Sequence, residues 1–265
     1  MAAMDPSVER LLRSMQVAGV RRLPAPRSAP AVPRPAAAAS APPPAGRPDA
    51  PRAPLVPPAP AFTASLFTAG RAAPATAPLD PAAELAAVAA EVAACRRCKL
   101  CEARNKTVPG EGSPTARILF VGEGPGADED RTGRPFVGRA GQLLDDIIVK
   151  GMKLRREDVY IANVVKCRPP GNRVPEPDEA AACAGYLDRQ IAAIRPAVIC
   201  ALGATAVRRL LDDERSMSSL RGRAYEYRGI PVIVTYHPAY LLRNPAAKVH
   251  TWQDIQKVME LARRG

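Results

Sequence analysis

Four short apolar runs rich in β-branched residues constrain the fold of this chain more than any other feature. The runs occupy residues 117–122, 159–165, 197–202 and 231–236. Segments with helical periodicity lie between and after them, at about 138–151, 176–194, 203–212 and 248–263. Apolar runs without alternation are typical of strands covered on both faces. The order of strands and helices therefore predicts an α/β fold, with a mostly parallel sheet and helices on both sides.

The distribution of proline divides the chain into two parts. Residues 1–80 hold 17 of the 30 prolines, and most of the rest of this segment is Ala, Arg and Ser. Such a segment has little apolar surface to offset the entropy of ordering it. We therefore expect a disordered extension over residues 1–80 and one folded domain over residues 81–265, beginning with a helix at about 81–94 that Asp80 caps.

Both parts of the chain are basic. The formal net charge is +12, with nine basic and four acidic residues in 1–80 and 29 basic and 22 acidic residues in 81–265. This balance suits a polyanionic partner, although ribosomal and membrane-surface proteins share it. The sequence has no apolar run of about 18 residues and no secretory signal, so we expect no membrane span and a reducing, cytoplasmic location.

Three of the four predicted strands run into polar or Gly/Pro-rich sequence. The first leads to Glu123 within a Gly-Glu-Gly-Pro-Gly stretch, the second carries Asn163, and the fourth ends at His237-Pro238. The third gives only Leu202-Gly203. Ligands of open α/β sheets bind at the carboxyl ends of the strands. A carboxylate, an amide and an imidazole should therefore meet above one sheet edge.

Five of the six cysteines are candidate ligands of one centre. Cys95 and Cys98 have the C-x2-C spacing that lets two thiolates of one turn reach one metal centre, and Cys101 repeats it. Cys167 and Cys183 follow far downstream, whereas Cys200 lies in an apolar strand and should be an inert core thiol. Zinc and an iron–sulfur cluster both fit four thiolates, and unrelated buried thiols are the alternative.

Several motifs occur together in one order. They are C-x2-C, G-E-G-P-G, G-R-P-F-V-G-R-A-G, N-V-V-K-C-R-P-P-x-N-R, Cys183 and Y-H-P-A-Y-L-L-R. In this order they resemble the family 4 uracil-DNA glycosylases, over about residues 92–258. The resemblance implies a three-layer α/β/α sandwich with a central four-stranded parallel sheet. It also implies excision of uracil from DNA by hydrolysis of the N-glycosidic bond, the first step of base excision repair.

The resemblance implies a [4Fe–4S] cluster as cofactor. Its ligands would be Cys95, Cys98, Cys167 and Cys183; Cys101 occupies a position that the family need not fill with cysteine. We expect the cluster to be structural, because it would join the segment 95–101 to the loop and helix of residues 167–183.

The resemblance also gives roles to residues around the base. Glu123 would position water and offset positive charge on the sugar, and His237 would donate to the uracil oxygen that gains charge. Asn163 would read the uracil edge, and Phe136 would stack on the base. Without the resemblance, the same side chains could be a solvated carboxylate, a turn residue and a core phenylalanine.

Other residues have less specific roles. Gly124 matches the pocket floor, and Glu129 matches the position that excludes the methyl group of thymine. Leu241 is a candidate wedge for the gap left by the flipped base, although a leucine there could equally be core. We expect the following arginines to contact phosphate groups: Arg168, Arg173 and Arg243.

Alternative functions remain at this point. A glycosylase with altered base preference, or a non-catalytic nucleic-acid-binding module on the same fold, would use the same architecture. The second would be expected to lack Glu123, Asn163 or His237, and all three are present. An electron carrier would favour closely spaced cysteines. We expect the protein to act as a monomer on uracil-containing DNA. A repair or replication protein is a second expected partner, and residues 1–80 are a candidate tether for it.

Overall fold

The computed structural model describes residues 80–264. The extension predicted over residues 1–80, and its candidate role as a tether, lie outside the described residues but for Asp80. Asp80 caps the first described helix, α2 (Pro81–Ala94), because its side chain accepts a hydrogen bond from the backbone N–H of Ala82 at 3.1 Å.

The centre of the fold is a six-stranded sheet in the order β1-β3-β2-β4-β6-β5. Its four inner strands are parallel, as the apolar runs predict: β2 (Ile118–Gly122), β3 (Tyr160–Asn163), β4 (Val198–Leu202) and β6 (Ile230–Thr235). The structure adds two short antiparallel edge strands to the expected four, β1 (Glu111–Gly112) and β5 (Ala224–Tyr227). These were not predicted, because two residues, or four that alternate between exposed and half-buried, make no continuous apolar run.

The predicted long helices are present. The segment 138–151 forms α5 (Arg139–Asp145), which continues as one π-helical stretch, Asp146–Gly151. The remaining long helices are α6 (Pro177–Ile194), α7 (Ala204–Leu211) and α10 (Lys248–Arg264). The shorter elements are α3 (Leu100–Ala103), α4 (Ala127–Thr132), α8 (Met217–Leu220), α9 (Pro238–Arg243) and the 3-10 turns Arg156–Asp158, Pro170–Asn172 and Pro245–Ala247.

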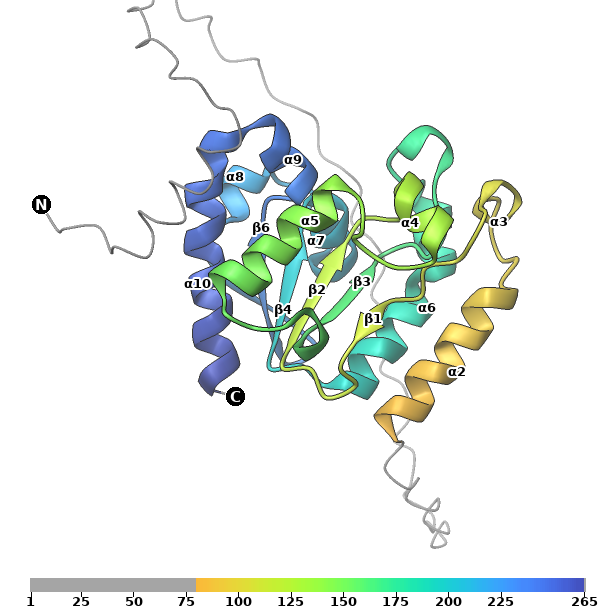
Figure 1. Cartoon of the computed structure of the whole chain (residues 1–265), viewed down its shortest axis with the longest axis horizontal. Coiled ribbons are helices and arrows are strands. Elements are labelled where there is room, and N and C mark those ends of the chain that lie inside the picture. The colour runs from red at the N-terminus through yellow and green to blue at the C-terminus, as the bar shows by residue number, and fades with distance from the viewer. Residues whose placement is uncertain (1–79, 265) are drawn as a thin grey trace, which may run out of the picture. The chain divides into compact units, whose positions relative to one another are not determined.

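The helices cover the sheet on both faces, so the fold has the expected three layers (Figure 1). Alternate residues of β2 show the division. Leu119 and Val121 belong to a core shared with α2, α6 and α7, whereas Ile118 and Phe120 belong to a second core shared with α5 and α10. Residues 118–122 are all buried, which explains why this strand is a continuous apolar run.

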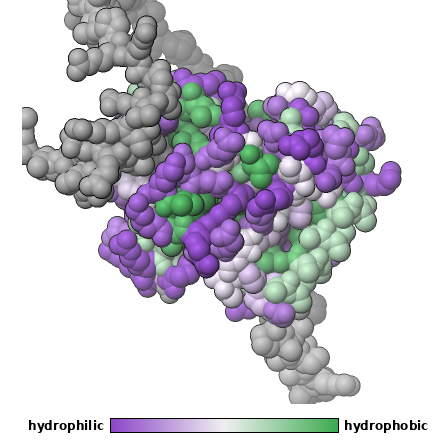
Figure 2. Space-filling view, in the orientation of Figure 1, coloured by the Kyte–Doolittle hydropathy of each residue, from purple (hydrophilic) through white to green (hydrophobic). Residues whose placement is uncertain are grey.

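The strand order places a crevice at the carboxyl end of β2. The chain passes from β2 to β3 on one side and then crosses to β4 on the other side of β2. Such a reversal leaves a binding crevice between the loops that follow the strands. The outer surface shown in Figure 2 is mostly hydrophilic, with separate hydrophobic patches and a pale strip over α2, whose exposed residues are mostly alanine. No helix in residues 80–264 has the length and apolar character needed to cross a membrane.

Candidate active site

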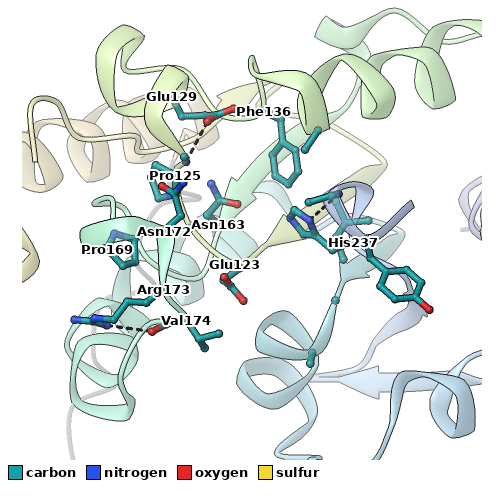
Figure 3. Close-up of a pocket in the computed structure, with 18 of the residues that line it drawn as sticks. Glu123, Pro125, Glu129, Phe136, Asn163, Pro169, Asn172, Arg173, Val174 and His237 are labelled. Atoms are coloured by element: carbon teal, nitrogen blue, oxygen red, sulfur yellow. Dashed lines mark hydrogen bonds between the residues drawn. The ribbon is translucent and has the colours of Figure 1, made fainter. Parts of the chain in front are cut away.

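A cavity of about 530 Å³ lies over the carboxyl ends of the four parallel strands. Glu123 follows β2, Asn163 ends β3, Gly203 follows β4 and His237 follows β6, and all four line the cavity. Figure 3 shows Glu123, Asn163 and His237 around one opening, with Phe136 beside His237. The carboxylate, amide and imidazole expected at one sheet edge therefore do meet there.

Asn163 carries a buried hydrogen-bond acceptor beside this cavity. The residue is 1% exposed, and its side-chain oxygen Oδ1 has no hydrogen-bond partner within residues 80–264. A buried acceptor without a partner is costly unless a ligand completes it. Gly122 lets the side chains of Asn163 and Phe136 pack against its backbone, because a Cβ at that position would lie 2.5 Å from both Asn163 Oδ1 and the ring of Phe136. Gly122 was not among the residues expected in the site.

A buried lysine holds Asn163 from behind. Lys166 Nζ donates to the backbone carbonyl of Asn163 at 2.9 Å and to Gln190 Oε1 at 2.7 Å. Lys166 is 1% exposed, and burial lowers its pKa to about 8. Gln190 in turn donates to the carbonyl of Pro109 at 2.7 Å. The backbone of Asn163 is therefore held by a buried polar network that was not expected from the sequence.

His237 is held with one nitrogen facing the backbone. Its Nδ1 accepts from the N–H of Ala239 at 3.1 Å and so caps the N-terminus of α9. Desolvation, with a further contribution from the positive charge of Arg243, lowers the pKa of His237 to about 4. The imidazole is therefore neutral at physiological pH, and its remaining proton must be on Nε2. The arrangement leaves Nε2–H as the free donor of this side chain.

Glu123 is half-buried in the lining of the cavity and has a single side-chain partner among the described residues. Thr205, near the start of α7, donates its hydroxyl to Glu123 Oε2. Thr205 is 8% exposed, so this contact is shielded from water. One carboxylate oxygen is thereby oriented and the other remains available. Thr205 was missed because a threonine early in a helix carries no sequence signal of its own.

Phe136 lies 5.5 Å from His237, measured between ring centroids, and is 4% exposed. Its backbone adopts φ +50°, a left-handed conformation that is unusual for a bulky side chain. Gly141 in α5 packs directly against the Phe136 carbonyl, so closely that a Cβ there would collide with it. Phe136 is thus a cavity residue in a strained backbone and not only a member of the core.

Glu129 lines the cavity, but its carboxylate is already occupied. Oε2 accepts from Gly126 N at 3.0 Å, and Oε1 accepts from Val137 N and Gly138 N, both at 2.8 Å. Glu129 therefore joins the loop after β2 to the loop that carries Phe136. Gly124, expected on the pocket floor, also lines the cavity.

Two of the three arginines expected to contact DNA line the cavity, and the third does not. Arg243 lines the mouth of the cavity and is exposed. Arg173 also lines it, but forms a bidentate ion pair with Glu179 at 2.6 and 2.8 Å. Arg168 does not line the cavity itself. It donates a hydrogen bond to the side chain of Asn172, which is a lining residue.

Of the two alternatives for Leu241, a wedge or a core residue, the structure supports the second. Leu241 is 1% exposed, because α9 turns it toward the interior. The exposed apolar side chains of α9 are instead those of Tyr240 and Leu242.

A second cavity brings together five cysteines. The lining includes the four expected ligands and also Cys101, together with Arg97, Arg104 and Tyr186. Within residues 80–264, no three side chains of His, Cys, Asp or Glu are close enough to bind one metal ion. Arg104 Nη1 donates to Cys167 Sγ at 3.0 Å, and Lys99 forms an ion pair with Glu176. Contacts between the first cysteine segment and the 167–183 region therefore exist in the protein itself.

Burial raises the pKa of the two downstream thiols. Desolvation raises the pKa of Cys167 to about 11 and also raises the pKa of Cys183, so both are protonated at neutral pH and would have to lose the proton to bind a metal. Cys200 is completely buried in β4, and desolvation raises the pKa of its thiol strongly. Cys200 is therefore a core residue, as its position in an apolar strand indicates.

Comparison with known proteins agrees with this architecture. The model of the family described as the uracil DNA glycosylase superfamily matches residues 109–256. A protein of Thermotoga maritima named type-4 uracil-DNA glycosylase is 48% identical over 181 residues, which cover 67% of this chain and 94% of the relative. Proteins with the same name from Sulfurisphaera tokodaii and Archaeoglobus fulgidus are 47% and 46% identical, over 65% and 64% of this chain and 82% and 89% of their own lengths.

Proposed function

The chain belongs to the uracil DNA glycosylase superfamily, and we propose that it excises uracil from DNA by hydrolysing the N-glycosidic bond. One observation carries the assignment of the site. Glu123, Asn163 and His237 line a single cavity, and the buried Asn163 side-chain oxygen has no partner among the residues that the structure describes. The proposal assigns this cavity to a uracil flipped out of the DNA stack, since a base inside the stack is out of reach of an enzyme.

Asn163 recognises the base in this proposal. Its side-chain oxygen accepts the imide N–H of uracil, and its NH2 group donates to the neighbouring carbonyl. Cytosine has an acceptor where uracil has the imide N–H, so binding cytosine would leave two acceptors facing each other in a buried site. Phe136 packs on the face of the same base, as aromatic side chains do with extruded bases.

His237 stabilises the leaving base. When the glycosidic bond breaks, negative charge develops on the ring and its oxygens, and the sugar takes on oxocarbenium character. His237 Nε2–H supplies a neutral donor for the charged oxygen, because Nδ1 is occupied by Ala239 and the lowered pKa keeps the ring neutral. A donor already fixed by its helix cap needs no reorientation as the charge develops.

Glu123 acts on the sugar side. One carboxylate oxygen is held by Thr205, and the other is free to orient a water molecule toward the sugar carbon. The negative charge of the carboxylate also offsets the positive charge that the sugar acquires. Thr205 is a positioning residue in this scheme, because it contacts Glu123 and not the substrate.

The cysteine cavity suits a [4Fe–4S] cluster as the resident cofactor. A cubane takes one thiolate at each of four irons, so its ligands surround a space and do not converge on one point. Cys95, Cys98, Cys167 and Cys183 line such a space, with Arg97 and Arg104 as cations beside the thiolates. When bound, the cluster would supply a covalent link between the 95–98 segment and the region that borders the active site. Cys101 is the fifth thiol and is left without an assigned iron.

The proposal extends to the rest of the molecule. Residues 81–265 form the glycosylase domain, which acts as a monomer in the cytoplasm, and Arg243 and Arg168 contact the phosphates of the bound DNA. Residues 1–80 bind a repair or replication partner. Glu129 crowds the C5 side of the base from its place between the two loops.

A cleavage assay tests the function. Purified protein is offered oligonucleotides that carry uracil, hypoxanthine or thymine opposite guanine, and alkali reveals abasic sites. Wild-type protein should release uracil and leave thymine, and Asn163→Ala should release uracil much more slowly while folding normally. Absence of uracil release by wild-type protein would reject the function. Full activity of Asn163→Ala would reject the assignment of the site.

A further inference from the structure

Phe136 is held in a conformation that it would not adopt alone. Its φ of +50° places a bulky residue in the left-handed region, which is unfavourable for a side chain of this size. Such a conformation persists only when the surrounding contacts require it. Glu129 supplies part of the restraint by accepting the backbone N–H groups of Val137 and Gly138.

Arg156 supplies the restraint on the other side of this segment. Its Nη1 donates to the carbonyl of Phe136 at 3.3 Å, and its Nη2 donates to the carbonyl of Pro135 at 2.5 Å. The guanidinium is itself oriented by ion pairs with Asp145 in α5 and Glu111 in β1. Its side chain is 13% exposed, so these contacts are largely shielded from water.

We propose that Arg156 is a positioning residue that holds Phe136 in the orientation required for stacking on the flipped base. The inference rests on the proposed function and adds a residue to it. Arg156 lines no part of the cavity and so acts only through the backbone of residues 135 and 136. A guanidinium suits this role because its planar donors can bind two adjacent carbonyls while pairing with a carboxylate.

The neighbouring arginine provides a matched control. Arg155 has a side chain that is 78% exposed and pairs with Asp158 at the surface, so Arg155→Gln removes the same group without touching Phe136. Arg156→Gln should weaken inhibition by free uracil about fivefold to a hundredfold, the range expected for a lost base–aromatic contact. Arg155→Gln should leave it unchanged. Arg156→Lys keeps the charge and should fall between wild type and Arg156→Gln.

A double-mutant cycle separates positioning from general stability. If Arg156 acts through Phe136, Arg156→Gln should change uracil inhibition less than twofold in a Phe136→Ala background. Equal effects in both backgrounds would overturn the proposal. So would wild-type inhibition in a folded Arg156→Gln protein.

A spectroscopic measurement keeps the inference separate from the proposed reaction. The chain has four phenylalanines, so fluorophenylalanine labelling gives a simple ¹⁹F spectrum in which Phe136→Leu identifies the Phe136 signal. This signal should shift or broaden in Arg156→Gln and Arg156→Lys but not in Arg155→Gln. A moved signal in a protein that releases no uracil would uphold the positioning and reject the reaction. An unmoved signal would reject the positioning even in an active enzyme.

Discussion

Two cavities of the molecule are built differently. The first, called the base cavity, contains Glu123, Asn163 and His237, and the second, the cysteine cavity, is lined by five cysteines. The base cavity lies over the ends of four parallel strands, and protein contacts hold the residues around it. Thr205 binds the Glu123 carboxylate, Lys166 binds the backbone carbonyl of Asn163, and His237 caps its own helix.

The cysteine cavity is formed by α2, the 95–101 segment, the loop after β3 and α6. Side-chain contacts already join these segments: Arg189 in α6 pairs with Glu84 and Glu91 in α2, and Arg104 donates to Cys167. In the first cavity, Glu123 and His237 are oriented by hydrogen bonds within the protein, whereas the four thiols proposed as ligands in the second would be joined to one another only by the cluster.

This difference predicts different consequences for mutations. A substitution in the base cavity should change the rate and leave the thermal stability nearly unchanged, because the strands below it keep their packing. A substitution in the cysteine cavity should lower the stability first, because loss of a metal group removes a cross-link between segments. Lys166 lies between the two regions, since it contacts Asn163 and also lines the cysteine cavity.

The largest expected effect is on catalysis. His237→Asn keeps a side-chain oxygen that can cap α9 but removes Nε2–H, so the single-turnover rate of uracil release should fall about 100- to 1000-fold. The melting temperature should stay within a few degrees of wild type. His250→Asn is the control, because His250 is the other histidine of the chain and is exposed; this variant should have the wild-type rate. A His237→Asn enzyme with a near-normal rate would contradict the role of the imidazole.

The next effect is on stability and separates the cysteines. Cys98→Ser should abolish the absorbance near 400 nm expected of the cluster and destabilise the fold by about 3 kcal/mol or more, which lowers the melting temperature by roughly 6–12 °C. Cys101→Ser should retain both the absorbance and the stability, although Cys101 lines the same cavity. Loss of iron in the Cys101→Ser protein would show that the ligand set has been assigned wrongly.

A smaller effect is expected for the residue that orients Glu123. Thr205→Val preserves the shape of the side chain but removes the hydrogen bond to the carboxylate, so the rate should fall about tenfold. Thr251→Val is the matched control, because Thr251 is 3% exposed and its hydroxyl has no hydrogen-bond partner in the described part of the chain. If both variants had the same activity as wild type, Glu123 would not need Thr205 for its orientation.

The smallest effect is on the pH dependence of stability. The pKa of His237 is lowered from 6.5 to about 4, so below pH 6.5 the unfolded chain binds a proton that the folded chain excludes. Its contribution to stability is therefore present above pH 6.5 and is lost as the pH falls toward 4, by about 1 kcal/mol at pH 5.5. Denaturant unfolding of wild type and His237→Asn at pH 7.5 and 5.5 measures it. A wild-type loss no larger than the loss in His237→Asn would contradict the lowered pKa.

Much of the fold could be predicted from local patterns. The inner strands and the long helices were confirmed to within a few residues, because burial on both faces produces the continuous apolar runs that identify such strands. The edge strands β1 and β5 and the π-helical end of α5 could not be predicted. Their existence depends on pairing with a neighbouring strand or on local packing rather than on their own composition.

The cavity residues divide in the same way. Glu123, Asn163 and His237 were expected together because strand ends of a parallel sheet meet at one edge. For Leu241 the sequence left two alternatives, a wedge or a core residue, and its burial favours the second; its exposure depends on the rotation of α9 and not on its distance from His237. Thr205 and Arg156 contact the site through side-chain bonds that cross between elements, and Lys166 is bound to Gln190 of α6 in the same way; no spacing in the sequence reveals such bonds.

By itself the sequence determined the order of strands and helices, the polar groups at the strand ends and the two groups of cysteines. Each of these follows from the periodicity or spacing of neighbouring residues. Only the tertiary structure decided that five thiols line one cavity, that Leu241 is buried and that Arg156 reaches the strained carbonyl of Phe136. These depend on packing between segments distant in the chain, where small rotations of a helix or loop change which side chains meet.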